Sequence, residues 1–220
     1  MNKIKSMLSV YFIAGSQDCR HLPGEPTENL LTILQRALEA GITCFQFREK
    51  GEQSLACDPQ LKRRLALKCL QLCRQFQVPF IVNDDVELAL SIQADGIHVG
   101  QKDTAVETIL RNARNKPIIG LSINTLAQAL ANKDRQDIDY FGVGPIFPTN
   151  SKADHSPVVG MNFIRQIRQL GIDKPCVAIG GIKEESAAIL RRLGTDGVAV
   201  ISAISHSVNI ANTVKTLAQK

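Results

Sequence analysis

Short aliphatic runs alternate with stretches of helical periodicity along the whole chain, and this alternation constrains the fold more than any other feature. Such runs of valine, isoleucine, leucine, alanine and phenylalanine are typical of buried strands. The expected strands are Ser9–Ala14, Cys44–Arg48, Pro79–Val82, Gly96–Val99, Ile118–Leu121, Tyr140–Val143, Cys176–Ile179 and Gly197–Val200.

Amphipathic stretches fill the intervals between these runs, with apolar residues recurring at helical spacing on one face. Gly41, Gly171 and Gly194 each follow such a stretch, at the position where a glycine commonly ends a helix. The expected helices are Thr27–Ala40, Leu61–Gln77, Val86–Ile92, Thr104–Asn112, Thr125–Asn132, Met161–Leu170, Glu184–Leu193 and Asn209–Ala218.

Strand and helix units repeated at regular spacing indicate an α/β protein with a parallel sheet. Eight such units favour a closed (β/α)₈ TIM barrel, with residues 1–220 as a single domain. A doubly wound open sheet is the alternative, although no G-x-G-x-x-G motif opens the chain. The amino-terminal stretch MNKIKSMLSVYFIAG is interpreted as the first strand rather than a signal peptide, because its apolar run is short and interrupted.

Composition narrows the class of ligand. The net charge of +5 is modest, and the densest basic cluster is only Lys62, Arg63 and Arg64, so we expect a small anionic ligand rather than nucleic acid. No run approaches the ~20 apolar residues that cross a bilayer, so a cytoplasmic protein without a membrane partner is expected. Cys69 and Cys73 share a helix face and are expected to be buried free thiols rather than a metal pair.

In a barrel of this kind, the chemistry lies at the carboxyl ends of the strands. After the second expected strand, alternation places Gln46, Arg48 and Lys50 on one side, with Phe47 and Glu49 on the other. Two cations and an amide that converge from one strand end indicate an anion site, most simply for a phosphate. The alternative is a solvated, charged loop.

Carboxylates follow the third and fourth expected strands. Asp84 and Asp85 are adjacent, and Asp103 comes soon after His98. Neighbouring carboxylates repel unless a cation or a proton lies between them, and Mg²⁺ is typically bound by one or two carboxylates. Asp85 is also placed to cap the next helix, and His98 is either a packed core residue or a site residue.

The remaining strand ends carry hydroxyls, glycines and one cation. Ser122 follows the fifth strand, where it is either a ligand contact or a helix cap. Glycine and serine amides after the seventh and eighth strands match the usual phosphate site of such barrels. No lysine lies inside a strand, which disfavours a Schiff-base aldolase, and no nucleophile triad is recognisable. Two anion sites beside a Mg²⁺ site indicate two phosphorylated substrates and group transfer with diphosphate as the leaving group. The residues concerned are Thr149, Ser151, Lys152, Gly181, Ile201 and Ser202.

These motifs together resemble the thiamine-phosphate synthase family. The resemblance runs from about residue 9 to residue 205 and includes the segments YFI, QFREK, VPFIVNDDVELAL, ADGIHVGQ, GPIFPT, AIGGI and ISAIS. It implies a (β/α)₈ barrel that joins hydroxymethylpyrimidine diphosphate to hydroxyethylthiazole phosphate and releases diphosphate. The small-molecule substrates are the partners implied, and the oligomeric state is not predicted.

Residue roles follow from the resemblance by position. It implies that Asp84 and Asp103 bind Mg²⁺, that Ser122 contacts the pyrimidine, and that Arg48, Lys50 and Lys152 are catalytic. Asn124 stands where many relatives have histidine, and Ser151 stands where the family often has threonine. The implied substrate-binding residues are Gln46, Phe47, Arg48, Glu49, Lys50, Asn83, Ser122, Thr149, Asn150, Ser151, Lys152, Gly181, Ile201 and Ser202.

The resemblance also implies a dissociative mechanism. The pyrimidine amino group expels diphosphate, the cations stabilise the departing charge, and the thiazole nitrogen attacks the resulting carbocation. The alternatives are an aminothiazole tautomerase of the same superfamily and a non-catalytic protein that binds thiazole phosphate. A barrel epimerase or decarboxylase is a third alternative, but it needs acid–base carboxylates or a lysine inside the strands.

Overall fold

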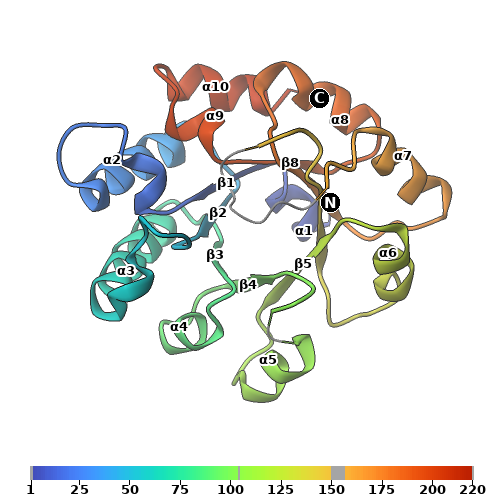
Figure 1. Cartoon of the computed structure of the whole chain (residues 1–220), viewed down its shortest axis with the longest axis horizontal. Coiled ribbons are helices and arrows are strands. Elements are labelled where there is room, and N and C mark those ends of the chain that lie inside the picture. Colours follow the sequence, from blue (N-terminus) through green and yellow to red (C-terminus); the bar gives the residue numbers. More distant parts are fainter. Residues whose placement is uncertain (1, 104, 150–156, 220) are drawn as a thin grey trace.

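The strands close into a barrel. The computed structural model describes residues 2–103, 105–149 and 157–219, and within these residues eight parallel strands pair in sequence order, with β1 also pairing with β8 (Figure 1). This confirms the closed (β/α)₈ barrel and excludes the open sheet. The strands are β1 (Val10–Ala14), β2 (Cys44–Phe47), β3 (Phe80–Asn83), β4 (Gly96–Val99), β5 (Ile118–Ile123), β6 (Tyr140–Val143), β7 (Cys176–Ile179) and β8 (Gly197–Val200).

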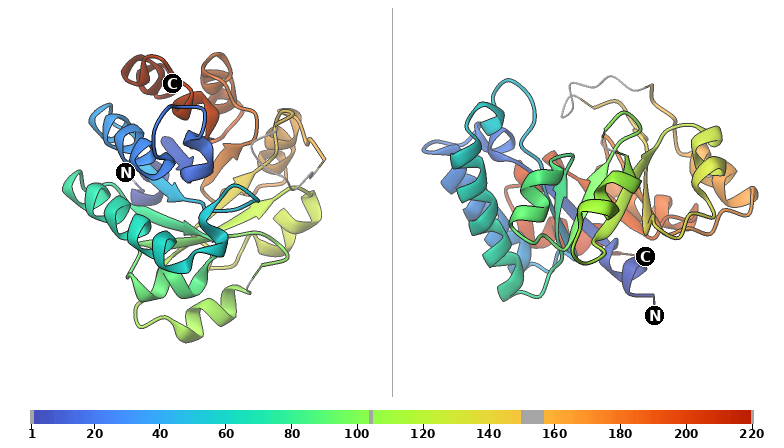
Figure 2. Two further views of the ribbon diagram at one scale, coloured as in Figure 1. Left: turned by 60° about the vertical axis from the view of Figure 1, so that its left-hand side comes forward. Right: turned by 90° about the horizontal axis from the view of Figure 1, so that it is seen from below.

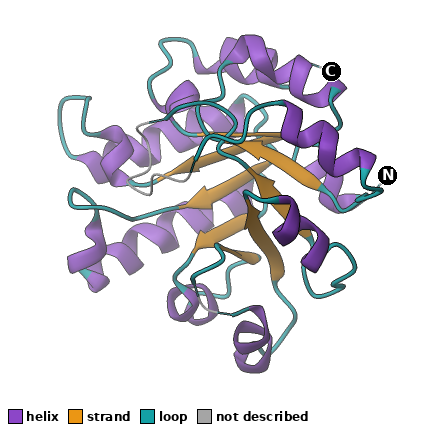
Figure 3. Ribbon diagram, turned by 45° about the vertical axis from the view of Figure 1, so that its right-hand side comes forward, coloured by secondary structure: helices purple, strands orange, loops and turns teal. Residues whose placement is uncertain are grey.

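Helices surround this ring of strands (Figure 3). They are α1 (Lys3–Met7), α2 (Pro26–Glu39), α3 (Pro59–Gln75), α4 (Val86–Ser91), α5 (Val106–Asn112), α6 (Leu126–Asn132), α7 (Asn162–Gln169), α8 (Glu184–Arg192), α9 (Ser202–Ser205) and α10 (Ile210–Leu217), with two short 3₁₀ helices, η1 (Ser16–Cys19) and η2 (Leu55–Cys57). Gly41, Gly171 and Gly194 follow α2, α7 and α8 with positive φ angles of 93°, 71° and 113°, as expected for glycines that end helices.

The hydrophobic core has an outer and an inner layer. The outer layer lies between the strands and the helices, where the rings of Phe45 and Phe47 both pack against Phe80. The inner layer fills the barrel and includes Tyr11 and Tyr140, together with residues of the other strands. Alternation along each strand sends neighbouring side chains to opposite layers, so the inward residues of β1, β2, β4, β5 and β6 determine what lies beneath the carboxyl ends.

The amino-terminal segment differs from the prediction. Residues 3–7 form the helix α1 instead of leading directly into a strand, because the Asn2 side chain accepts a hydrogen bond from Ile4 N and caps it. The apolar residues at the end of α1, Met7 and Leu8, join the inner layer, so α1 closes the amino-terminal end of the barrel (Figure 2). The strand itself begins at Val10.

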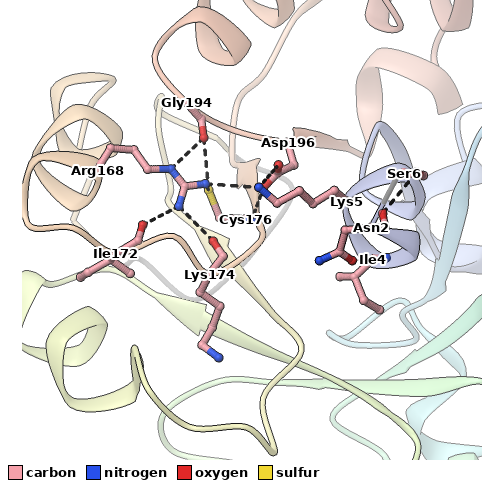
Figure 4. A network of polar contacts seen from close by, with 10 residues as sticks. All are labelled: Asn2, Ile4, Lys5, Ser6, Arg168, Ile172, Lys174, Cys176, Gly194 and Asp196. Atoms are coloured by element: carbon pink, nitrogen blue, oxygen red, sulfur yellow. Dashed lines mark hydrogen bonds and ion pairs between the residues drawn. The ribbon is translucent and has the colours of Figure 1, made fainter.

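Polar contacts at this closed end tie α1 to the last part of the barrel (Figure 4). Lys5 Nζ lies 3.4 Å from Asp196 Oδ1. Arg168 donates to the carbonyl oxygens of Gly194 and Ile172, at 2.9 and 2.6 Å, and contacts Asp196 at 3.5 Å. Arg168 therefore satisfies carbonyl groups in the turns that follow α7 and α8.

The cysteines behave as predicted. All six lie within the described residues and are free, and Cys69 and Cys73 are buried. Burial raises the pKa of both thiols, which keeps them protonated. Among the described residues, no helix has the length and apolar character needed to cross a membrane.

Candidate active site

A cavity of about 760 Å³ opens at the carboxyl ends of the strands. A smaller hollow adjoins it, and the two share Thr149, Ile179 and Gly180 in their walls. The expected site residues that line the cavity are Arg48, Lys50, Asn83, Asp84, Asp103, Ser122 and Thr149, and those that line the hollow are Thr149, Gly181, Ile201 and Ser202. Asn150, Ser151 and Lys152 lie outside the described residues.

The end of β2 presents its cations to the cavity. Arg48 is only 5% exposed, so the alternative of a fully solvated loop is wrong for this residue. Phe47 packs in the outer core, and the Glu49 carboxylate accepts hydrogen bonds from Ser16 and Leu55. The side chains of Phe47 and Glu49 therefore do not enter the cavity, because strand alternation turns them outward, and their assignment to substrate binding stays a prediction.

Asp84 and Asp85 have separate roles. Asp85 caps α4 by accepting a hydrogen bond from Leu88 N at 2.9 Å, as predicted. Asp84 has a φ of 59°, in the left-handed region that non-glycine residues rarely adopt, and such strain is concentrated at functional sites. Its carboxylate lies 2.9 Å from Lys50 Nζ. The strained backbone thus separates the two adjacent carboxylates. Asp85 turns toward the start of α4, and Asp84 turns toward the cavity.

Asp103 meets Asp84 from the neighbouring strand end. Its Oδ2 accepts a hydrogen bond from Gly100 N at 2.7 Å. Burial raises the pKa of Asp103, and the nearby carboxylate of Asp84 raises it further. Two oxygen ligands held in contact, beside a cation, suit a hard divalent ion such as Mg²⁺. The ligand chemistry of Asp84 and Asp103 is compatible with such an ion, and a magnesium site here stays a prediction.

His98 and Ser122 occupy the floor of the cavity. His98 is 6% exposed, and its Nε2 lies 2.9 Å from Ser122 Oγ. Thr125, not Ser122, caps α6, so the helix-cap alternative for Ser122 is wrong. Gln46 is 2% exposed and lies below the cavity, where its amide donates to the hydroxyl of Tyr11 at 2.9 Å. Tyr11 is a polar neighbour of the site that sequence reasoning missed.

The adjoining hollow is built on a glycine turn. Gly180 and Gly181 follow β7 with φ angles of 90° and 63°. A Cβ atom on Gly181 would lie 2.5 Å from Pro148 O, so this position excludes any side chain. The loop after β6 packs on the same turn, since Phe147 N donates to Gly180 O at 3.1 Å. Ile201 and Ser202, at the start of α9, complete the wall.

The fold and the cavity together define a class of protein. A (β/α)₈ barrel that holds cations, paired carboxylates and a glycine turn at the carboxyl ends of its strands is an enzyme scaffold for small anionic substrates.

Comparison with known proteins specifies the family. A family model described as thiamine monophosphate synthase matches residues 10–204. A thiamine-phosphate synthase from Mannheimia succiniciproducens is 98% identical over 220 residues, covering 100% of both chains. One from Actinobacillus succinogenes is 77% identical, covering 99% of each chain. The solved structure of a thiamine phosphate pyrophosphorylase from Pyrococcus furiosus matches with a TM-score of 0.79 at 31% identity, covering 97% of this chain and 95% of that one. The chain belongs to the thiamine monophosphate synthase family and is an enzyme.

Proposed function

We propose that the protein joins 4-amino-2-methyl-5-(diphosphooxymethyl)pyrimidine to 4-methyl-5-(2-phosphooxyethyl)thiazole, giving thiamine phosphate and diphosphate in thiamine biosynthesis. The observation that carries this proposal is the pair of adjoining compartments. One is lined by cations and carboxylates, as a diphosphate with its metal ion requires. The other is lined by a glycine turn and the start of α9, as a phosphate monoester requires. The names of the relatives agree with this assignment.

In this proposal the cations hold the leaving group. Arg48 and Lys50 bind the diphosphate oxygens, and Lys50 is steered toward them by the carboxylate of Asp84. Asp84 and Asp103 would hold Mg²⁺, which supplies neutralisation of the charge on the departing diphosphate. Lys152, beyond the described residues, is expected to add a further cation.

Bond breaking precedes bond formation. The pyrimidine amino group donates electron density into the ring, and the bond between the methylene carbon and the diphosphate oxygen breaks with its electron pair on oxygen. The thiazole nitrogen then attacks the methylene carbon with its lone pair. Its phosphate, held near Gly181 and Ser202, orients it for this attack. The nitrogen carries no proton to lose, so no general base is needed.

The charged residues favour this reaction over the tautomerase. Arg48, Lys50, Asp84 and Asp103 all line the cavity, although proton transfer on a thiazole phosphate gives them no leaving group to stabilise. A protein that only binds thiazole phosphate has equally little use for them.

The experiment is synthesis of thiamine phosphate by the purified protein from the two substrates, with Mg²⁺ and with EDTA. We expect product only with Mg²⁺, and no Mg²⁺-dependent turnover by Asp84→Ala. The matched control is Asp134→Ala, which removes a carboxylate that is 84% exposed and pairs only with surface Lys133 in the described structure. A near-normal rate for Asp84→Ala would refute the metal assignment. Thiazole phosphate binding without product would refute the synthase reaction itself.

A further inference from the structure

A chain of buried side-chain hydrogen bonds crosses the barrel beneath the cavity. Gln46 Nε2 lies 2.9 Å from Tyr11 Oη, which lies 2.8 Å from Tyr140 Oη. Tyr140 Oη is 3.0 Å from His98 Nδ1, and His98 Nε2 is 2.9 Å from Ser122 Oγ. The five residues come from β2, β1, β6, β4 and β5. The chain therefore links Gln46 and Ser122 through three side chains that the proposed reaction does not use.

The barrel provides the space for these rings. Tyr11 and Tyr140 are 1% and 0% exposed, and their rings meet edge to face. A Cβ atom on Gly120 would lie 2.2 Å from Tyr140 Cζ and 2.4 Å from His98 Nδ1. A Cβ atom on Gly142 would lie 2.9 Å from His98 Cε1. Side chains at these two inward positions would displace the rings, so the glycines of β5 and β6 leave room for the hydrogen-bonded chain.

We propose that Tyr11, Tyr140 and His98 are positioning residues that turn the hydroxyl proton of Ser122 toward the bound pyrimidine. Gln46 donates its amide proton to Tyr11, Tyr11 donates to Tyr140, and Tyr140 donates to His98 Nδ1. His98 then carries its proton on Nε2 and donates it to Ser122 Oγ. Each tyrosine hydroxyl then donates once and accepts once, and both ring nitrogens of His98 have a partner, as buried polar groups require. Ser122 is left with a proton that points into the cavity.

As a consequence, Ser122 selects the orientation of the substrate ring by requiring a hydrogen-bond acceptor opposite its hydroxyl. Ser122 presents a donor, so it pairs with an acceptor atom of the substrate, such as a pyrimidine ring nitrogen, and disfavours a ring turned to present a donor. This deepens the proposed function and rests on it for the identity of the ligand. The direction in which these side-chain hydrogen bonds run, however, is a property of the protein alone and does not depend on the ligand.

The chain differs from a nucleophile triad despite its Ser–His contact. In such a triad, a carboxylate on the far ring nitrogen stabilises the imidazolium. Here that partner is the phenol of Tyr140, and burial raises the pKa of both Tyr140 and Tyr11, so both remain neutral donors. The chain orients a proton and does not remove one.

The direct test is the tautomer of His98, read from ¹⁵N NMR of the full protein labelled at histidine, at about pH 8, where histidine is neutral. The sequence has four histidines, and the signal lost in His98→Gln identifies the right one. We expect a bare Nδ1 and a protonated Nε2. A protonated Nδ1 would overturn the proposal, because the chain would then run in the opposite direction. This measurement needs no substrate, so it stands even if the synthase reaction fails.

The functional test is Tyr140→Phe, which removes one hydroxyl from the middle of the chain and keeps the ring. We expect the KM for the pyrimidine diphosphate to rise by about ten-fold, the worth of one hydrogen bond, with the KM for thiazole phosphate unchanged. The His98 tautomer should also become mixed. The control is Thr213→Val on α10, which removes a buried hydroxyl bonded to Glu184 and Ser207 away from the cavity.

The outcomes separate positioning from simple stability. Equal losses of stability in Tyr140→Phe and Thr213→Val, with a changed pyrimidine KM only in the first, support the proposal. Unchanged kinetics in Tyr140→Phe, or equal changes in both KM values, refute it. Should Tyr140→Phe fail to fold, Tyr11→Phe breaks the chain one residue earlier and is expected to give the same selective KM change.

Discussion

Glu49 holds two loops to the end of β2 although it points away from the cavity. Its Oε1 accepts a hydrogen bond from Ser16 N, and its Oε2 accepts from Leu55 N at 2.8 Å and from Ser16 Oγ at 3.0 Å. Glu49→Gln keeps the shape and removes the charge. The new amide has one oxygen, so it can face Ser16 N or Leu55 N, but its NH₂ group must face the other.

The expected loss of folding stability follows from this mismatch between donors and acceptors. A hydrogen bond to a charged group contributes about 1.5–3 kcal/mol, and the backbone donor left unpaired makes the upper half of this range appropriate. We take about 2.5 kcal/mol, which for a chain of this size lowers Tm by roughly 5–10 °C. Arg48 and Lys50 flank Glu49, so the KM for the diphosphate substrate should rise as the strand end loosens.

The assay is thermal unfolding followed by circular dichroism, with kinetics measured well below Tm. The control is Glu39→Gln on the exposed face of α2, where the carboxylate accepts only from Gln35 in the described structure. Surface substitutions of that kind change the free energy of unfolding by no more than about 0.5 kcal/mol. Equal Tm values for the two variants would refute the reasoning, because the carboxylate of Glu49 would then not be holding the loops.

Other predictions concern packing, the closed end of the barrel and pH. Gly120→Ala places a methyl group 2.2 Å from Tyr140 Cζ, so urea unfolding should show a loss of about 1–3 kcal/mol, and an unchanged midpoint would contradict the packing. Arg168→Leu removes the donor to several carbonyls and a contact of Asp196. Guanidinium unfolding should therefore show a loss of stability of about 2–4 kcal/mol. A smaller loss would indicate that water replaces the guanidinium as the hydrogen-bond donor. Burial, and then His21, lower the pKa of His206, so the folded protein binds fewer protons than the unfolded chain and loses stability as the pH falls below about 6.5. Between pH 8 and pH 5, the Tm of His206→Gln should therefore fall less than that of the unsubstituted protein. An equal fall would show that other groups cause the acid sensitivity.

The strands could be predicted from the sequence because each is a local pattern. Four of the eight, β4, β6, β7 and β8, have the predicted ends, and the others differ by one or two residues. The capping role of Asp85 was equally local, since a helix begins directly after it. The short helix α1 was missed because it has only five residues, too few to show a helical period, and the cap at Asn2 is a weak signal.

The site was predictable only in part. Alternation correctly separated Arg48, which lines the cavity, from Phe47 and Glu49, whose side chains point away from it. The role of His98 stayed open because its partners are distant in sequence, with Ser122 24 residues away and Tyr140 42 residues away. No local pattern reports such contacts, because barrel closure brings them together.

Pairing of the first strand with the last has a consequence for synthesis on the ribosome. β1 leaves the ribosome early, but one of its edges is covered only by Val198–Val200 of β8. At about 5–20 residues per second, that edge stays open for roughly 10–40 s. A chain truncated before β8 would keep an unpaired strand at each side of its sheet and should recruit chaperones or aggregate. Pairing of β8 with β1 and β7 is then the step that removes both open edges and the risk of aggregation that goes with them.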